Sequence, residues 1–206
     1  MNKVITISRQ YASGGREIGQ RLAEEWNIPF YDNELITRAA KNSGYAKEAF
    51  EKAESRATNS LLYSIARGVP SLGGISGTFT NLSLDDQIYI AQADVIKKAA
   101  AEGPCIIVGR CADYVLRQME DVVNIFVWAD MPFRVERAQR IDHMSPDRIE
   151  ENILKMDKRR ANYFNFHTGE KWGKTENYSL CLNSGRVGIE NAVKIIKSVV
   201  EAQCGK

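Results

Sequence analysis

A serine, two glycines, an arginine and a glutamate follow one another between a short apolar run at residues 4–7 and a helical pattern that carries Ile18, Leu22 and Trp26 on one face. A strand, a glycine turn and a helix N-terminus bring backbone N–H groups and the positive end of a helix dipole to one point, where an anion is stabilised. The pattern therefore predicts a phosphate-binding loop. Its five residues are Ser13, Gly14, Gly15, Arg16 and Glu17.

The loop departs from the nucleotide-binding pattern G-x-x-x-x-G-K-[ST]. In that pattern the glycines let backbone N–H groups wrap the phosphates, the lysine neutralises them, and the hydroxyl holds magnesium. If Gly14 is the second motif glycine, Arg9 stands at the first and Gly15 stands at the lysine. A turn with only a structural role is therefore the alternative to a phosphate site.

Arg16 and Glu17 could supply the missing chemistry. A guanidinium at Arg16 could reach back to the β- or γ-phosphate, because its geometry matches phosphate oxygens. The carboxylate of Glu17 could hold Mg²⁺. The alternative for Glu17 is an acidic first-turn residue that complements the helix dipole.

Short apolar runs alternate with helical patterns after this loop. The runs are continuous rather than alternating, which indicates strands covered on both faces. This order predicts an α/β fold, with a parallel sheet and helices on both of its faces. The further strands are expected at 28–31, 105–108, 124–128 and 178–182, and helices at 84–99, 112–116, from Asp130 and Pro132, from Ser145-Pro146, and from Ile189, with a turn at 183–185.

Polar side chains follow several of the expected strands. Asp32 follows the second strand, and Gly109-Arg110 follows the run that ends at residue 108. The carboxyl ends of parallel strands form the ligand-binding edge of such sheets, so these residues should converge there with the loop. Asp32 could instead be only a helix cap, and Arg110 only a paired arginine.

Length, composition and charge exclude several classes of protein. The 206 residues suit one domain, 44% of them are hydrophobic, and a net charge of +2 argues against a nucleic-acid partner. We find no apolar run of the length that a membrane span requires and no leader pattern, so we expect a cytoplasmic protein without a membrane partner. The four cysteines form no C-x-x-C pair. The sequence does not indicate an oligomeric state.

Several segments resemble the cytidylate kinase-like family of P-loop kinases, over nearly the full chain. The divergent branch of that family shares an S-R-x-x-x-S-G-G-R-E-I loop and a late A-N-Y-x-x-F-H-T-G segment followed by W-G. The matching segments here are ISRQYASGGREI at 7–18, FYDNELITR at 30–38, VGR at 108–110, RAQR at 137–140, ANYFNFHTG at 161–169 and WG at 172–173.

This resemblance implies a P-loop kinase-like three-layer sandwich in a single domain. Its core would be about 1–32, 84–142 and 177–206, with a helical acceptor-side insertion at about 33–83 and a lid at about 143–176. ATP and Mg²⁺ would be the cofactors, and a nucleoside monophosphate, CMP-like, would be the acceptor. By resemblance, the acceptor site comprises Asp32, Arg38 and Arg110, and the lid arginines are Arg159 and Arg160.

Three positions differ from the orthodox family pattern. Gly15 replaces lysine, Glu17 replaces a magnesium-binding threonine, and Cys111 replaces an aspartate after Gly-Arg. Two alternatives to a cytidylate-like kinase therefore remain. One is a nucleotide- or anion-binding protein without transferase activity, and the other is a kinase for a different small-molecule acceptor.

Overall fold

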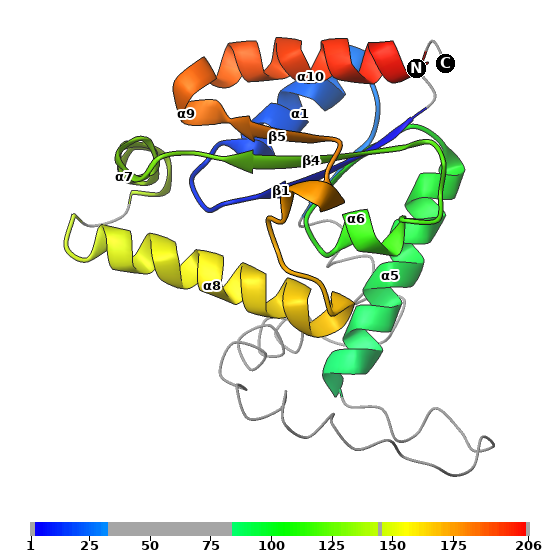
Figure 1. Cartoon of the computed structure of the whole chain (residues 1–206), viewed down its shortest axis with the longest axis horizontal. Helices are drawn as coiled ribbons and strands as arrows, with labels where there is room; N and C mark the ends of the chain where they lie inside the picture. The colour runs from blue at the N-terminus through cyan, green and yellow to red at the C-terminus, as the bar shows by residue number, and fades with distance from the viewer. Residues whose placement is uncertain (1–2, 33–83, 144–145, 205–206) are drawn as a thin grey trace.

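The computed structural model describes residues 3–32, 84–143 and 146–204 (Figure 1). Within these ranges the strands form one parallel sheet in the order β2-β3-β1-β4-β5. Because β1 lies at the centre, its carboxyl end points into the middle of the ligand-binding edge. The strands are β1 (Val4–Arg9), β2 (Phe30–Tyr31), β3 (Ile106–Val108), β4 (Val122–Trp128) and β5 (Leu180–Asn183).

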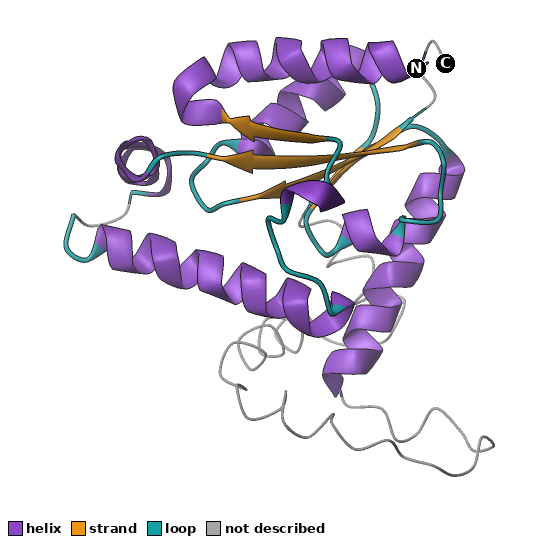
Figure 2. Ribbon diagram, viewed as in Figure 1, coloured by secondary structure: helices purple, strands orange, loops and turns teal. Residues whose placement is uncertain are grey.

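Helices cover both faces of the sheet, as Figure 2 shows. Successive strand side chains point to opposite faces. Ile5 and Ile7 accordingly pack with α1 (Gly15–Trp26) and α10 (Ile189–Cys204), whereas Val4 packs with α5 (Leu84–Glu102) and α6 (Ala112–Val115). The predicted α/β three-layer architecture is confirmed.

Two further helices lie beyond the carboxyl edge of the sheet. They are α7 (Met131–Asp142) and α8 (Ile149–Thr168), and a small apolar cluster that includes Ala138 and Ile153 packs them against the loop residues Tyr11 and Ala12. The long helix α8 runs beneath the sheet in Figure 1. Apolar packing therefore ties the predicted lid segment to the predicted phosphate loop.

Some element boundaries differ from the sequence expectation. Arg148 has a φ of 58°, so helix α8 begins at Ile149 rather than at Ser145-Pro146. The predicted turn at 183–185 opens a short helix, α9 (Ser184–Val187), because the Asn183 side chain accepts hydrogen bonds from two backbone N–H groups at its start. A 3₁₀ turn, η2 (Thr175–Asn177), precedes β5.

Part of the sequence prediction lies outside the described residues. This applies to Arg38 and to the proposed insertion at about 33–83, so the division into core, insertion and lid stays a prediction. A bilayer-spanning helix, sufficiently long and apolar, is not found among the described residues.

Candidate phosphate-binding site

The predicted phosphate loop joins the central strand β1 to helix α1. Ala12 and Gly14 have φ values of 58° and 83°, which turn the backbone sharply into the helix. A side chain at Gly14 would also collide with Ile189 on α10. The left-handed backbone therefore favours glycine there, and a Cβ would in addition require the end of the Ile189 side chain to move.

The hydroxyl of Ser13 braces this loop. It is fully buried and donates toward the carbonyl oxygens of Gln10 at 2.9 Å and Val127 at 3.1 Å. The Ser184 hydroxyl hydrogen-bonds to the Ser13 carbonyl oxygen and also lies 3.1 Å from the carbonyl oxygen of Trp128. Ser13 thus fixes the loop to the carboxyl ends of β4 and β5, and a phosphate would meet the loop's backbone rather than this hydroxyl.

A buried ion pair ties the loop to α7 and α8. Asp157 accepts a hydrogen bond from the backbone N–H of Tyr11 at 2.6 Å, and Arg134 donates to the Tyr11 carbonyl oxygen at 2.8 Å. Arg134 and Asp157 also pair directly, with side chains only 4% and 12% exposed. The backbone at Tyr11 is therefore held from both sides by one satisfied charge pair.

Two cavities adjoin this loop. The first, which we call the loop cavity, has a volume of about 500 Å³. It lies against the N-terminus of α1, where the first N–H groups have no partner within the helix. Its lining residues are Arg9, Gln10, Tyr11, Ala12, Gly14, Gly15, Arg16, Glu17, Gln20, Arg137, Ile141 and Arg160.

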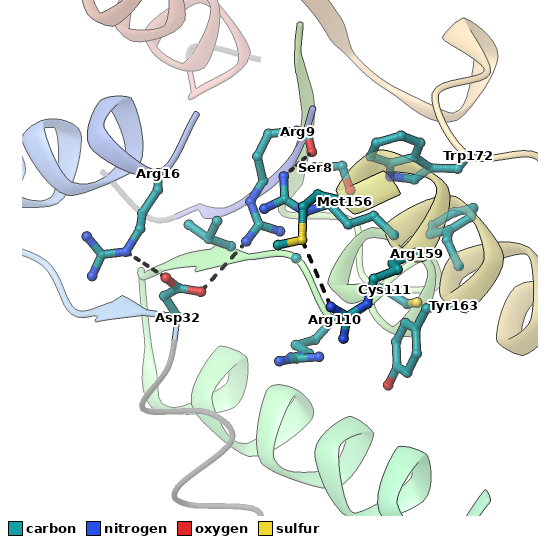
Figure 3. A pocket seen from close by; sticks show the side chains of 14 residues that line it. Ser8, Arg9, Arg16, Asp32, Arg110, Cys111, Met156, Arg159, Tyr163 and Trp172 are labelled. Atoms are coloured by element: carbon teal, nitrogen blue, oxygen red, sulfur yellow. Dashed lines mark hydrogen bonds and ion pairs between the residues drawn. The ribbon is translucent and has the colours of Figure 1, made fainter. Parts of the chain in front are cut away.

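The second cavity, which we call the arginine cavity, has a volume of about 380 Å³ and is drawn in Figure 3. It is bounded by the carboxyl ends of β1 and β3 and by α8. Its polar lining holds one carboxylate, Asp32, and five guanidinium groups. The arginines are Arg9, Arg16, Arg110, Arg159 and Arg160. Three of them also line the loop cavity, and these are Arg9, Arg16 and Arg160.

Asp32 lies between two of these arginines (Figure 3). Arg16 Nε donates to Asp32 Oδ2 at 2.7 Å, and Arg9 Nη2 lies 3.8 Å from Asp32 Oδ1. The Arg16 side chain is 56% exposed, and its guanidinium lies 5.7 Å from the ring centroid of Phe30. The structure therefore brings the predicted residues Asp32 and Arg16 together, with Arg16 turned toward the arginine cavity wall.

Both carboxylate oxygens of Glu17 are engaged. One accepts a hydrogen bond from Arg21 at 2.6 Å, and the other from Arg137. Burial opposes ionisation of this carboxyl, but the hydrogen bonds and positive charges of Arg137 and Arg21 outweigh it and lower the pKa of Glu17. The described residues also form no cluster of three or more metal-ligating side chains. Arginines thus contact both oxygens of Glu17, and its role as a magnesium ligand stays a prediction.

Arg110 follows β3 in an unusual backbone conformation. Gly109, Arg110 and Cys111 have successive φ values of 81°, 58° and 56°. Left-handed backbone costs a non-glycine residue about 1–2 kcal/mol, and such strain concentrates at functional sites. The Arg110 guanidinium lies 6.0 Å from the ring centroid of Tyr163, whose hydroxyl donates to Gln92 at 2.6 Å. The strand end thus directs Arg110 toward α8 and the cavity.

Helix α8 contributes the two predicted lid arginines. Arg160 Nη1 donates to the carbonyl oxygen of Arg9 at 3.0 Å, and its guanidinium lies 5.4 Å from the ring centroid of Tyr11. Burial is the largest influence on Arg160 and lowers its pKa, with the Asp157 charge opposing it. Arg159 lines the arginine cavity, and its Nη1 lies 4.0 Å from Met156 Sδ. Arg160 therefore reaches the loop itself.

Arg9 was not predicted as a site residue, although it lies in the wall common to both cavities. Burial, followed by repulsion from Arg160, lowers its pKa to about 9, with Asp32 opposing the shift. The available signal was a charge at the end of the apolar run at residues 4–7, the same signal that identified Arg110.

Asp113 was also missed. Its side chain is buried at the start of α6, and Ser8 Oγ lies 3.4 Å from its Oδ2. The Tyr178 hydroxyl lies beside this carboxylate and interacts with it. Burial raises the pKa of Asp113 to about 6, against an opposing hydrogen bond from the Tyr114 backbone.

The parallel strand order and the glycine loop between β1 and α1 define a P-loop kinase-like protein. The cytidylate kinase-like family matches residues 4–186, so the chain belongs to that family. Family and fold together assign the chain to kinase-like proteins that act by nucleotide-dependent phosphoryl transfer.

Solved structures agree with this fold. An uncharacterized protein from Eubacterium ventriosum is 25% identical, with a TM-score of 0.70 over 97% of this chain and 98% of its own. Shikimate kinase from Bacteroides thetaiotaomicron is 14% identical, with a TM-score of 0.53 over 98% and 99% of the two chains. A gluconokinase from Sinorhizobium meliloti is 12% identical, with a TM-score of 0.52 over 98% and 93%. The last two likenesses concern the fold alone. A search among curated proteins found no match.

The raised pKa of Asp113 predicts a specific pH dependence of stability. Its folded pKa of about 6 exceeds the ordinary 3.8, so the folded state binds more protons between these values and stability falls as pH rises through them. The full difference corresponds to about 3 kcal/mol. Asp113→Asn should remove this fall, as measured by urea unfolding at pH 4 and 7.5. Asp121→Asn, at an exposed carboxylate, is the control. An identical pH dependence in Asp113→Asn and wild type would contradict the argument.

The buried pair of Arg134 and Asp157 predicts non-additive mutations. Asp157→Leu should lower the free energy of unfolding by about 3–5 kcal/mol, because it leaves the Arg134 guanidinium buried without its carboxylate. Arg134→Leu/Asp157→Leu should be more stable than Asp157→Leu, since neither charge then remains. Urea unfolding of wild type, Arg134→Leu, Asp157→Leu and the double variant measures both effects. A double variant that loses the sum of the two single losses would contradict the coupling.

Proposed function

We propose that this protein transfers the terminal phosphoryl group of ATP to the phosphate of a nucleoside monophosphate, with a CMP-like acceptor. The observation that carries this proposal is the pair of adjoining cavities with a common wall of arginines at Arg9, Arg16 and Arg160. Phosphoryl transfer depends on positioning two anionic reactants and neutralising the charge between them. Two cavities that meet at guanidinium groups suit that requirement.

The loop cavity suits the phosphates of the donor. Backbone N–H groups at the start of α1 and the helix dipole favour an anion there. Arg137 pairs with Glu17, so the positive charge of this wall is partly balanced. In the proposal Ser13, Gly14, Gly15 and Arg16 hold the donor phosphates, with Ser13 acting by bracing the loop. Magnesium arrives with ATP rather than in a preformed protein site.

The arginine cavity suits the acceptor. Five arginines face one carboxylate, which favours a phosphate over a neutral ligand. In the proposal Arg110 binds the acceptor phosphate, and Asp32 orients Arg16 or a hydroxyl of the acceptor. Arg38 is part of the same proposal but lies outside the described residues. Phe164 and Trp172 add an aromatic part to the lining, against which a base can pack.

The transfer step requires no proton acceptor when the acceptor phosphate is dianionic. An oxygen of that phosphate forms a bond to the γ-phosphorus of ATP, the bond from this phosphorus to the bridging β-oxygen breaks, and ADP leaves with the electron pair. Arg159 and Arg160 on α8 cover the arginine cavity, which limits competition by water.

A nucleotide-binding protein without transferase activity is the second candidate. It is favoured by the glycine at the lysine position of the motif and by the pairing of Glu17 with two arginines. Such a protein would use the same loop and cavities to hold a nucleotide.

An acceptor panel separates these functions. The purified protein is incubated with Mg-ATP and separately with CMP, UMP, AMP, GMP, shikimate and gluconate, and ADP and the phosphorylated product are followed. We expect CDP formation, with other monophosphates slower by about tenfold or more. A phosphorylated product from a non-nucleotide acceptor would replace the acceptor in the proposal. ATP binding without turnover on any acceptor would establish the binding protein instead.

Glu17→Gln tests where magnesium is held. Because arginines engage both carboxylate oxygens of Glu17, we expect the affinity for Mg-ATP not to fall. Loss of the negative charge should instead strengthen binding of metal-free ATP, since Arg137 then becomes available to phosphate. Calorimetry with and without magnesium measures both, and Glu24→Gln on the exposed side of α1 is the control. A fall in the affinity for Mg-ATP, with an unchanged affinity for metal-free ATP, would return Glu17 to the role of metal ligand.

A further inference from the structure

Arg9 combines three features, and the proposed function gives it no role of its own beyond the common wall of the two cavities. It ends the central strand, it lines both cavities, and its side chain is 19% exposed. Its guanidinium lies directly against Gly109, where a Cβ would collide with Nη1. The absence of a side chain at Gly109 therefore leaves room for this cation at the junction of the two cavities.

The side chain of Arg9 also explains the glycine at position 15. A Cβ built on Gly15 would lie 2.6 Å from the Cβ of Arg9 and 3.1 Å from its Cγ, and 3.3 Å from the Cβ of Val127. Real Cβ atoms do not approach backbone-anchored carbons so closely. Side chains at positions 9 and 15 compete for one space, so a lysine at 15 is incompatible with an arginine at 9.

The electrostatic surroundings of Arg9 favour an anionic ligand. The charges of Arg160, Arg110 and Arg16 all disfavour its protonated form, and Asp32 at 3.8 Å is the carboxylate that favours it. With a pKa of about 9 the guanidinium remains charged at neutral pH. Clustered charges of one sign in a mostly buried site are costly unless an opposite charge compensates them. A phosphate at the cavity junction supplies that charge.

We propose that Arg9 is a catalytic residue that binds the transferred phosphoryl group in place of the motif lysine. Relative to the G-x-x-x-x-G-K-[ST] motif, the cation and the glycine have exchanged positions. Arg9 at the end of the strand supplies the positive charge, and Gly15 at the end of the loop leaves room for the Arg9 side chain. The guanidinium can contact two phosphate oxygens at once and so neutralise the charge that develops as the phosphoryl group passes from ATP to the acceptor and ADP leaves. This inference rests on the proposed transferase function.

Arg9→Met tests the role while keeping most of the side-chain volume. We expect ATP affinity to fall by about 10- to 100-fold and AMP affinity by less than about threefold, because a charged hydrogen bond to the terminal phosphates is lost. Calorimetry measures both ligands. Arg117→Met, at an exposed arginine that lines neither cavity, is the control and should match wild type.

Stability distinguishes a ligand-binding role from a structural one. Removing one of several mutually repelling cations should leave the urea midpoint of ligand-free Arg9→Met equal to or above that of wild type. A midpoint well below wild type, with ATP affinity unchanged, would show that Arg9 is structural and would overturn the proposal.

The exchanged positions allow a rescue experiment. Arg9→Gly should lose ATP affinity as Arg9→Met does, and Gly15→Lys alone should lower stability because its side chain collides with Arg9. Arg9→Gly/Gly15→Lys should regain at least about tenfold in ATP affinity over Arg9→Gly, since the cation returns from the other position. No regain in a double variant with a wild-type urea midpoint would contradict the exchange.

Turnover separates this inference from the function on which it rests. If wild type converts CMP to CDP, kcat of Arg9→Met should fall by about 100-fold or more, with a smaller change in the KM for CMP. Wild-type turnover with an equal kcat in Arg9→Met would overturn the role of Arg9 and leave the transferase intact. No turnover by wild type on any acceptor would overturn both the transferase and the catalytic role.

Discussion

Repulsion among guanidinium groups at the carboxyl edge of the sheet is the constraint on which the site depends. Arg9, Arg110 and Arg160 approach one another where Asp32 is the nearby carboxylate. The fold must hold these cations in place without a ligand, since folding alone gains little from gathering like charges. Rigid supports are therefore needed: a strand end for Arg9, a left-handed turn for Arg110 and a long helix for Arg160.

The same constraint accounts for the polar contacts around the loop. The Ser13 hydroxyl is used entirely to brace the loop, and Asp157 is used to hold the Tyr11 backbone and to pair with Arg134. These groups are buried and satisfied, so they fix geometry. Asp32 is shared between Arg9 and Arg16 and balances only part of the charge beside it. Buried groups whose hydrogen bonds are all made within the protein position the loop. Guanidinium groups whose charge is not fully balanced by a carboxylate are available to a ligand.

The sequence predicts much of the fold because the relevant signals are local. Continuous apolar runs predicted the strands, and Gly14 and Gly15 predicted the turn between β1 and α1. Contacts between side chains that are far apart in the sequence leave no such local signal. Glu17 and Arg137 are 120 positions apart, and no periodicity shows that they meet. Helix α8 likewise begins at Ile149, after the left-handed Arg148, and Ile149 packs in the apolar cluster beside the loop, which the helix-start signal at Ser145-Pro146 does not show.

Arg134 and Arg9 show how residues of one type divide between structure and function. Arg134 is 4% exposed and has both a carboxylate and a carbonyl oxygen as acceptors, so its charge is compensated by the protein. Arg9 is 19% exposed and faces three cations across two cavities. The residue type alone does not separate them. The balance of charge around each guanidinium separates them. A guanidinium that is surrounded by an excess of positive charge creates affinity for phosphate.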